Sequence, residues 1–222
     1  MREDAEKSSE HSPQHLAQPV LELGRLCMKF ARTDRLIHSD RDGTPESDTD
    51  HTFMLALISG AIAADYLPEL DHTKVIEFAL IHDLPEVIAG DVATINISDE
   101  DYQAKQAKEE EAIEILGQAF DTDFPWITKT IRDYESLDTP EARFVKIMDK
   151  VMPSILHFDN GGFSLAFHGV ETVEKVDSST QKTTARIEAY NYDQPLATNL
   201  WQEFIDKIKR ELFDDGGKLK IS

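Results

Sequence analysis

Cysteine, long apolar runs, glycine and proline are all scarce in this sequence. The one cysteine, Cys27, excludes an internal disulfide and a cysteine-based zinc site, and it fits a reducing compartment. No apolar segment approaches the ~20 residues that a membrane span needs. Residues 1–14 lack the apolar core of a secretory signal. We therefore expect a soluble, cytoplasmic protein that does not contact the membrane.

Positive charge is also scarce. The chain has 23 lysine and arginine residues against 43 aspartate and glutamate residues, which gives a formal net charge of −20. Such a surface repels nucleic acids and anionic lipids, because their binding depends on lysine and arginine side chains. We expect no nucleic-acid partner. A small phosphorylated substrate would need local positive charge, which a bound metal cation can supply.

Helical periodicity runs through most of the chain, and no stretch alternates apolar and polar residues for long enough to demand a sheet. Residues 1–18 lack apolar periodicity and are expected to form a disordered tail. No linker divides residues 19–222, which predict one all-α domain. The predicted helices span residues 19–34, 50–66, 72–84, 99–119, 125–135, 139–158, 170–190 and 196–213.

Three predicted helices carry polar side chains on faces that are otherwise apolar. His51 begins one such stripe, His82 extends a second, and Asp149 lies within a third. A carboxylate on a buried face is costly unless it is paired or bound to a metal. The apolar members of the stripes are Met54, Leu55 and Ile58 after His51, Val75, Phe78 and Ala79 before His82, and Val145, Met148 and Met152 around Asp149.

Each of these residues also has a structural explanation. A single histidine on an apolar face is more often a hydrogen-bonded core residue, and Asp149 can pair with a neighbouring lysine. Three such helices in one chain favour a shared site formed by His51, His82, Asp83 and Asp149. Two imidazoles and two carboxylates suit one divalent cation, such as Mn, Co, Mg, Fe, Ni or Zn. Because no thiolate is available, we favour a six-coordinate site over closed tetrahedral zinc.

The order His51, His82-Asp83 and Asp149 resembles the H…HD…D signature of HD-domain phosphohydrolases. The segments that carry the resemblance are DTDHTFMLAL, ALIHDLPEVIAGDV and RFVKIMDKVMPSIL. The Leu-Pro-Glu followed by Gly-Asp is similar to the branch that contains bacterial 5′-deoxynucleotidases and the eukaryotic HD-domain-2 proteins. The resemblance covers residues 21–169 and implies an HD-domain helical bundle, with the C-terminal residues as a helical extension.

The resemblance implies catalytic roles for Asp83 and Glu86. Glu86 follows His82 by four residues and Asp83 by three, so a continuing helical turn would place it beside both. It would act as general acid or base, or position the attacking water. The alternative is an exposed glutamate at a helix start, where the helix dipole favours a negative charge.

The resemblance also implies substrate contacts. Arg32, in the segment MKFARTDRL, would face the phosphate, with Arg35 as the alternative if the alignment is shifted. Asp91 would contact the sugar hydroxyl, although on local grounds it is an ordinary loop acid. Lys146, one turn before Asp149, faces either the phosphate or solvent.

Two features depart from the family pattern. Asp50 precedes the first histidine where the family often has glutamate. The loop between Arg35 and His51 contains Gly43 and Pro45, and it looks longer than in the compact bacterial enzymes. That loop lies where a substrate lid would stand, so it affects substrate identity more than chemistry.

The expected reaction is the hydrolysis of nucleoside 5′-monophosphates, with 2′-deoxy sugars, to nucleoside and phosphate. The metal and Arg32 are the main positive features that the sequence assigns to the pocket, and two such features suit a single phosphate group. The alternatives are triphosphohydrolysis, cyclic-nucleotide cleavage, alarmone hydrolysis or a non-catalytic all-α binding module. The stripe Leu200, Phe204, Ile208 and Leu212, beside Trp201, predicts a terminal helix packed on the core, with a homodimer interface as the alternative.

Overall fold

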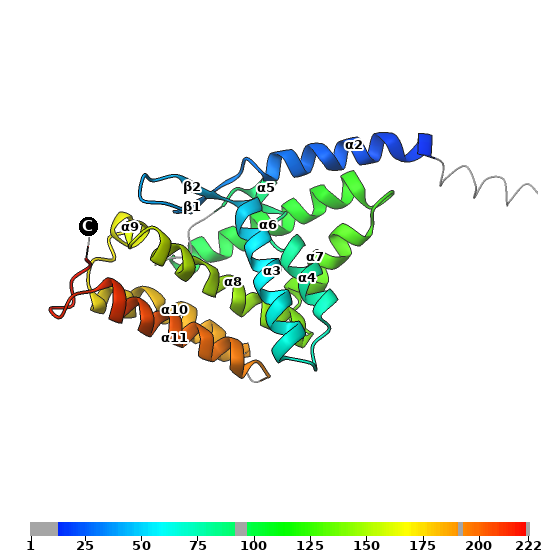
Figure 1. Ribbon diagram of the computed structural model, residues 1–222. Helices are drawn as coiled ribbons and strands as arrows, with labels where there is room; N and C mark the ends of the chain where they lie inside the picture. The colour runs from blue at the N-terminus through cyan, green and yellow to red at the C-terminus, as the bar shows by residue number, and fades with distance from the viewer. Residues whose placement is uncertain (1–12, 92–96, 191–192, 221–222) are drawn as a thin grey trace, which may run out of the picture.

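Helices form most of the structure. The computed structural model describes residues 13–91, 97–190 and 193–220 (Figure 1). The helices are α2 (Pro13–Phe30), α3 (Asp48–Tyr66), α4 (His72–Ile81), α5 (Glu86–Ala89), α6 (Asp99–Phe120), α7 (Trp126–Glu135), α8 (Pro140–Asp159), α9 (Phe163–Phe167), α10 (Val173–Tyr190) and α11 (Pro195–Leu212). The all-α prediction is confirmed, apart from one small hairpin.

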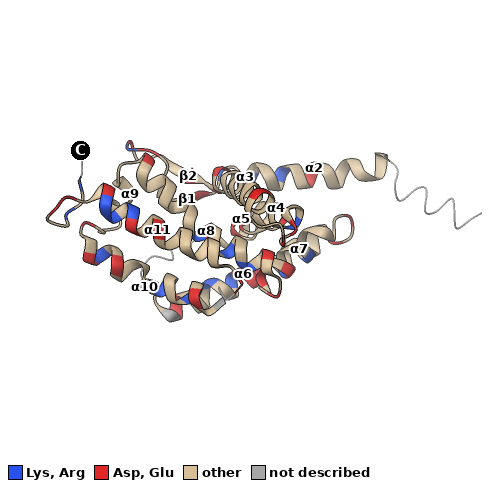
Figure 2. Ribbon diagram, turned by 60° about the horizontal axis from the view of Figure 1, so that its bottom comes forward, with Lys and Arg blue, Asp and Glu red and all other residues tan. Residues whose placement is uncertain are grey.

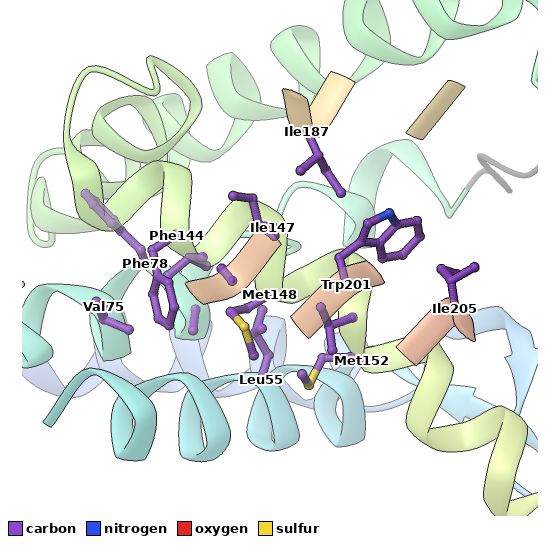
Figure 3. Close-up of a cluster of buried hydrophobic side chains, with 14 of the residues drawn as sticks. Leu55, Val75, Phe78, Phe144, Ile147, Met148, Met152, Ile187, Trp201 and Ile205 are labelled. Atoms are coloured by element: carbon purple, nitrogen blue, oxygen red, sulfur yellow. The ribbon is translucent and has the colours of Figure 1, made fainter. Parts of the chain in front are cut away.

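Helix α8 runs through the middle of the molecule, and most of its side chains are buried. The Thr139 side chain caps its first turn by accepting a hydrogen bond from the Ala142 amide, and Pro140 occupies the position where proline suits a helix. The main apolar cluster surrounds α8. Figure 3 shows Met148 near Leu55 of α3, with Trp201 of α11 in the same cluster.

A second apolar cluster joins α2, α6 and α7. It contains Phe30, Leu116 and Ile131, together with Ile81 at the end of α4. Phe78, three residues earlier on α4, belongs to the main cluster instead. The end of α4 therefore lies where the two apolar clusters meet, and side chains of both clusters pack against its last turn.

The predicted absence of a sheet is wrong for one short segment. Strands β1 (Asp34–His38) and β2 (Pro45–Ser47) form an antiparallel hairpin from the loop that looked long in the sequence. The Asp40 carboxylate accepts hydrogen bonds from the Asp42 and Thr44 amides and so closes the turn. Strands of five and three residues are too short for their alternation to be recognised.

The first helix is also placed differently from its prediction. Helix α2 begins at Pro13 and ends at Phe30, whereas the periodicity predicted 19–34. Pro19, which resembles a helix start, lies inside the helix. Residues 13–18 are therefore helical rather than part of a tail, and residues 1–12 lie outside the described residues. The extent of the domain otherwise stays a prediction.

The C-terminal stripe packs on the core, as its first interpretation predicted. Trp201 and Ile208 are buried, and Leu200, Phe204 and Leu212 are partly buried against the main cluster. Acidic and basic residues are spread along α10 and α11 (Figure 2). Among the described residues, no helix is both long enough and apolar enough to cross a bilayer.

Candidate active site

Three helices bring the predicted ligand set together. Ser47 caps α3 and places His51 in its first turn. His82 directly follows the last residue of α4, and Asp149 lies in the middle of α8. One ligand atom from each of His51, His82, Asp83 and Asp149 lies within 4.8 Å of the others. All four are buried or half-buried, so the apolar faces predicted from the sequence do converge on one point.

The spacing of these atoms fits one shared ion. His82 Nε2 lies 2.9 Å from Asp83 Oδ2, and His51 Nε2 lies 3.0 Å from Asp149 Oδ1. The other two distances between these imidazole and carboxylate atoms are both 3.8 Å. They join His51 Nε2 to Asp83 Oδ2 and His82 Nε2 to Asp149 Oδ1. Ligands at about 2.1 Å from one octahedral ion lie about 3 Å apart when adjacent and about 4 Å apart when opposite.

Backbone contacts orient His82 for such a role. Its Nδ1 lies 2.8 Å from the Ala79 carbonyl oxygen, which fixes the ring and turns Nε2 towards the cluster. This buried Nε2 lies close to Asp83 Oδ2, but within the described part of the chain it makes no hydrogen bond of good geometry. Burial alone would lower the pKa of His82, but the carboxylates of Asp83 and Asp149 outweigh it and raise the pKa. An ion would therefore bind with release of a proton.

Negative charge accumulates on one side of the cluster, around Arg35. The guanidinium Nη1 lies 2.5 Å from Asp83 Oδ2 and 3.5 Å from Asp48 Oδ1, and Nε lies 3.2 Å from Glu46 Oε2. Burial, followed by the charge of Asp83, raises the pKa of Asp48 to about 7. Among the described residues, neither oxygen of Asp48 has a hydrogen-bond partner. This excess of buried carboxyl groups fits a site that binds a cation.

Glu86 lies at the edge of the same cluster. Its side chain is buried, and Oε1 accepts a hydrogen bond from Lys105 Nζ at 3.1 Å. Burial, reinforced by the negative charge of Asp83, raises the pKa of Glu86. An exposed glutamate at a helix start is thus ruled out. Gly90 ends the short helix α5 at φ 76°, a conformation that glycine adopts without strain.

The structure does not bring Arg32 to this site. Arg32 follows the end of α2 and lines a shallow outer groove with Val20, Leu21 and Met28. Arg35, the alternative, lines the main cavity and contacts Asp83. Because β1 is a strand, alternate side chains share a face, which places Arg35 on the same side as the buried Ile37.

Asp91 and Lys146 both line the cavity, and both already have partners. Asp91 Oδ2 accepts a hydrogen bond from the Leu36 amide at 2.9 Å, which ties the end of α5 to β1. Lys146 Nζ lies 3.2 Å from Glu135 Oε1 and 4.9 Å from the centre of the Tyr134 ring. Lys150, rather than Lys146, pairs with Asp149, at 2.7 Å.

A cavity of about 770 Å³ extends from this cluster. Its lining includes His82, Asp83 and Glu86 at one end, and it continues along α8 to α10 and α11. A pocket of this size with a charged end is a common form of ligand site.

Residues 29–191 match the sequence model of the HD domain family. This chain belongs to the HD domain family. The matched segment contains the hairpin, all four clustered residues and α10, so the resemblance suggested by the sequence motifs is confirmed.

Curated relatives of this HD domain protein are similar over shorter stretches. It is 32% identical over 139 residues to 5′-deoxynucleotidase HDDC2 of Homo sapiens, and the match covers 61% of this chain and 65% of that protein. It is 32% identical over 112 residues to 5′-deoxynucleotidase hdd1 of Schizosaccharomyces pombe, which is 48% of this chain and 54% of that protein. The chain thus spans about half to two thirds of the length of these relatives.

Solved structures share the fold of this HD domain protein. A crystal structure of a predicted metal-dependent phosphohydrolase from Magnetospirillum magnetotacticum MS-1 matches with a TM-score of 0.68 and 23% identity. The match covers 87% of this chain and 95% of that chain. At this identity, the likeness establishes the fold alone.

Sequence reasoning missed three residues of the site in this HD domain. Asp48 lies three residues before His51, so a polar residue one turn earlier on the same helix was the available signal. Glu46 lies on β2, which was not predicted. Lys105 is one lysine within the charged helix α6, and nothing in its local sequence distinguishes it.

Proposed function

We propose that this HD domain protein is a metal-dependent phosphohydrolase that releases inorganic phosphate from nucleoside 5′-monophosphates, with a preference for 2′-deoxy sugars. One observation carries the proposal: two imidazole nitrogens and two carboxylates lie within 4.8 Å of one another at the end of a cavity, beside the buried acid Glu86. The names of the curated relatives, which are 5′-deoxynucleotidases, support the substrate class.

The proposed ligands of one divalent cation are His51, His82, Asp83 and Asp149. Their mixed nitrogen and oxygen set suits Mn, Co, Fe, Ni or Zn, and Mg through its carboxylates. When bound, such an ion polarises a phosphate oxygen and lowers the pKa of a coordinated water. The chain keeps the ligands oriented, because the Ala79 carbonyl holds the His82 ring and Lys150 contacts Asp149.

Glu86 has the proton-transfer role in this proposal. Lys105 holds its Oε1, while Oε2 has no hydrogen-bond partner among the described residues and is left for the proton. Oε2 takes a proton from the attacking water as the oxygen–phosphorus bond forms. It then gives that proton to the nucleoside 5′-oxygen as the phosphorus–oxygen bond breaks. Burial raises the pKa of Glu86, which suits the second step, and the charge of a bound cation would favour the ionised form that the first step needs.

Arg35 replaces Arg32 as the proposed phosphate contact. Its side chain lines the cavity, is 14% exposed and touches Asp83. Because Nη1 contacts Asp83 and the buried Nε lies beside Glu46, the proposed contact to the phosphate is made by Nη2. Asp91 stays the proposed contact to the sugar hydroxyl through the oxygen that does not bind the Leu36 amide. Lys146 stays a candidate contact at the side of the cavity.

The cationic side chains that line the cavity bear on the number of phosphate groups in the substrate. Lys105, Lys146 and Lys150 also line the cavity, and so do Arg132 and Arg186, so the metal and Arg35 are not its only cationic features. Each of these lysines contacts a carboxylate: Glu86, Glu135 and Asp149, respectively. Arg132 likewise pairs with Glu110 and Glu114, whereas Arg186 lies over the Tyr102 ring. Because most of these cations already have carboxylate partners, the lining favours a monophosphate over a triphosphate.

Steady-state assays on matched mono- and triphosphates test the proposal. We expect the metal-loaded protein to have a higher kcat/KM on 2′-deoxynucleoside 5′-monophosphates and to release inorganic phosphate. A higher kcat/KM on the triphosphate, with triphosphate as product, would identify the alternative reaction on the same scaffold. Absence of turnover on mono-, tri- and cyclic nucleotides and on alarmones would favour a binding module.

A homodimer and a cytoplasmic location remain proposals as well. The stripe on α11 is packed on the core. We therefore propose the outer side of α3 and α4, one of the faces with exposed apolar side chains, as the contact with a second copy. Phe53 and Leu57 are 68% and 61% exposed there, and Leu80 is 52% exposed. Two copies with a net charge of −20 repel least where the contacting side chains are uncharged. Sedimentation of the parent and of Leu57→Glu tests this, and a monomeric parent would exclude it.

A further inference from the structure

One end of the cavity lies away from the four proposed metal ligands, and it has no role in the hydrolysis described above. Helix α8 runs along the cavity, and Asp149, Pro153 and His157 line it at intervals of one turn. With a rise of 1.5 Å per residue, His157 lies about 12 Å along the helix from Asp149. The cavity therefore continues well beyond the position of the scissile phosphate.

Apolar side chains from three helices line this far end. Leu165 comes from α9, Val176 from α10, and Ile205 from α11. All three are buried members of the main cluster. Phe158, the neighbour of His157, contacts Phe204 of α11, with 6.3 Å between ring centres, so α11 packs against this part of α8. A flat apolar molecule would find an uncharged wall here.

His157 is a buried polar residue at this end of the cavity, which Ser154 of α8 and several polar residues of α10 also line. Its side chain lines the cavity, the residue is only 7% exposed, and its Nδ1 has no hydrogen-bond partner among the described residues. A buried polar atom without a partner is costly, and such atoms usually mark a ligand, a water or a functional group. Burial, with a smaller effect of His168, lowers the pKa of His157 to about 4. At neutral pH the ring is therefore uncharged, with one donor and one acceptor nitrogen.

We propose that His157 determines specificity by hydrogen-bonding the nucleobase of the substrate, whose ring lies against the apolar wall of Leu165, Val176 and Ile205. The inference rests on the proposed function, which places the phosphate beside the four proposed metal ligands. Phosphate, sugar and base follow one another in a nucleotide, so the base points along α8 towards His157. A base has an apolar face and an edge of hydrogen-bond donors and acceptors. At this end of the cavity the apolar wall can contact the face, and the His157 ring can hydrogen-bond the edge.

The test compares a substrate that has a base with one that lacks it. The probes are 2′-deoxyadenosine 5′-monophosphate and 2-deoxyribose 5-phosphate, which share the sugar and the phosphate. His157→Leu removes the hydrogen bond and keeps an apolar side chain, whereas His157→Gln keeps a donor and an acceptor. His72→Leu, at the exposed start of α4, is the matched control.

We expect His157→Leu to lower kcat/KM for the nucleotide roughly 3- to 10-fold, mainly through KM, as the loss of one hydrogen bond predicts. The value for 2-deoxyribose 5-phosphate should stay within about twofold, His157→Gln should recover most of the loss, and His72→Leu should change neither substrate. Equal losses on both substrates would mean that His157 is structural. No change on either would mean that it binds only an internal water. Both results overturn the proposal.

A binding measurement separates this proposal from the proposed function. The nucleoside 2′-deoxyadenosine carries no phosphate, so its affinity for the parent and for His157→Leu does not depend on turnover. Weaker binding by the variant would support the base contact even if the parent hydrolysed neither phosphorylated probe, a result that would contradict the proposed reaction alone. Equal binding by both proteins, or no binding by the parent, would overturn the role of His157.

Discussion

The two ends of the cavity differ in the kind of interaction that they offer. At one end, Arg35 and two imidazoles meet a cluster of carboxyl groups, and most of these charged groups are buried. At the other end, His157 of α8 is a buried polar group that faces apolar side chains of α9, α10 and α11. The first end can bind an ion and move a proton, whereas the second can only select a shape and a hydrogen-bonding edge.

The difference implies unequal costs of substitution. Removing a charge from the first end leaves its buried partners uncompensated, whereas removing His157 costs one hydrogen bond. Substitutions at the charged end should therefore affect all substrates alike, and those at the apolar end should affect only substrates that reach it.

The largest effect is expected for Asp149→Ala. The variant loses a proposed ligand and leaves His51 and Lys150 without their partner, so we expect the loss of both bound metal and turnover. Elemental analysis and a phosphate-release assay measure the two effects. Asp159→Ala, exposed near the end of the same helix, is the control and should retain both. Normal metal content in Asp149→Ala would show that the ligand assignment is wrong.

The next effect in size is expected for Glu86→Gln, which keeps the size of the side chain and its contact with Lys105. Because the variant loses only the proton-transfer group, we expect kcat to fall about 10²- to 10⁴-fold with metal content unchanged. Single-turnover and steady-state rates at saturating metal measure this. Unchanged turnover would make Glu86 a structural acid.

A smaller effect is expected for Arg35→Lys, which keeps the charge and loses the planar fork. We expect kcat/KM to fall roughly 10- to 100-fold, as for the loss of a charge-assisted hydrogen bond. The matched variant Arg32→Lys changes the same residue type three positions earlier, outside the cavity, and should stay within about twofold. If Arg32→Lys caused the larger loss, Arg32 rather than Arg35 would be the residue that contacts the phosphate.

The smallest effect at the charged end is expected for Lys146→Met. Lys146 pairs with Glu135, whose side chain is 44% exposed, and such pairs contribute little. The methionine keeps an apolar stem over the Tyr134 ring. We expect kcat/KM on a 5′-monophosphate to change less than about threefold. A loss above tenfold would assign the phosphate contact to Lys146.

The sequence was sufficient to predict the part of the site that lies on long helices. His51, His82 and Asp149 stand out because each interrupts an apolar stripe with a period of 3.6 residues. The structure brings these residues together with Asp83 at the end of the cavity. Their roles as metal ligands stay a prediction, which a metal titration tests.

The rest of the site depends on short elements and on tertiary contacts. The periodicity of α2 gives no sign that the helix stops at Phe30, so the strand that places Arg35 inside could not be predicted. Lys105 approaches Glu86 from a helix that begins thirteen residues later in the chain, and no local pattern encodes that contact. His157 lies on a predicted helix, but its cavity exists only after α9, α10 and α11 have packed on α8.

The most direct test of the account is a titration of the metal-depleted protein with Mn²⁺, followed by measurement of bound metal and of phosphate release from 2′-deoxyadenosine 5′-monophosphate. If one ion at His51, His82, Asp83 and Asp149 supports the reaction, activity and occupancy should rise together and saturate at about one ion per chain. Full activity in the metal-depleted protein, or turnover that does not follow occupancy, would contradict the account.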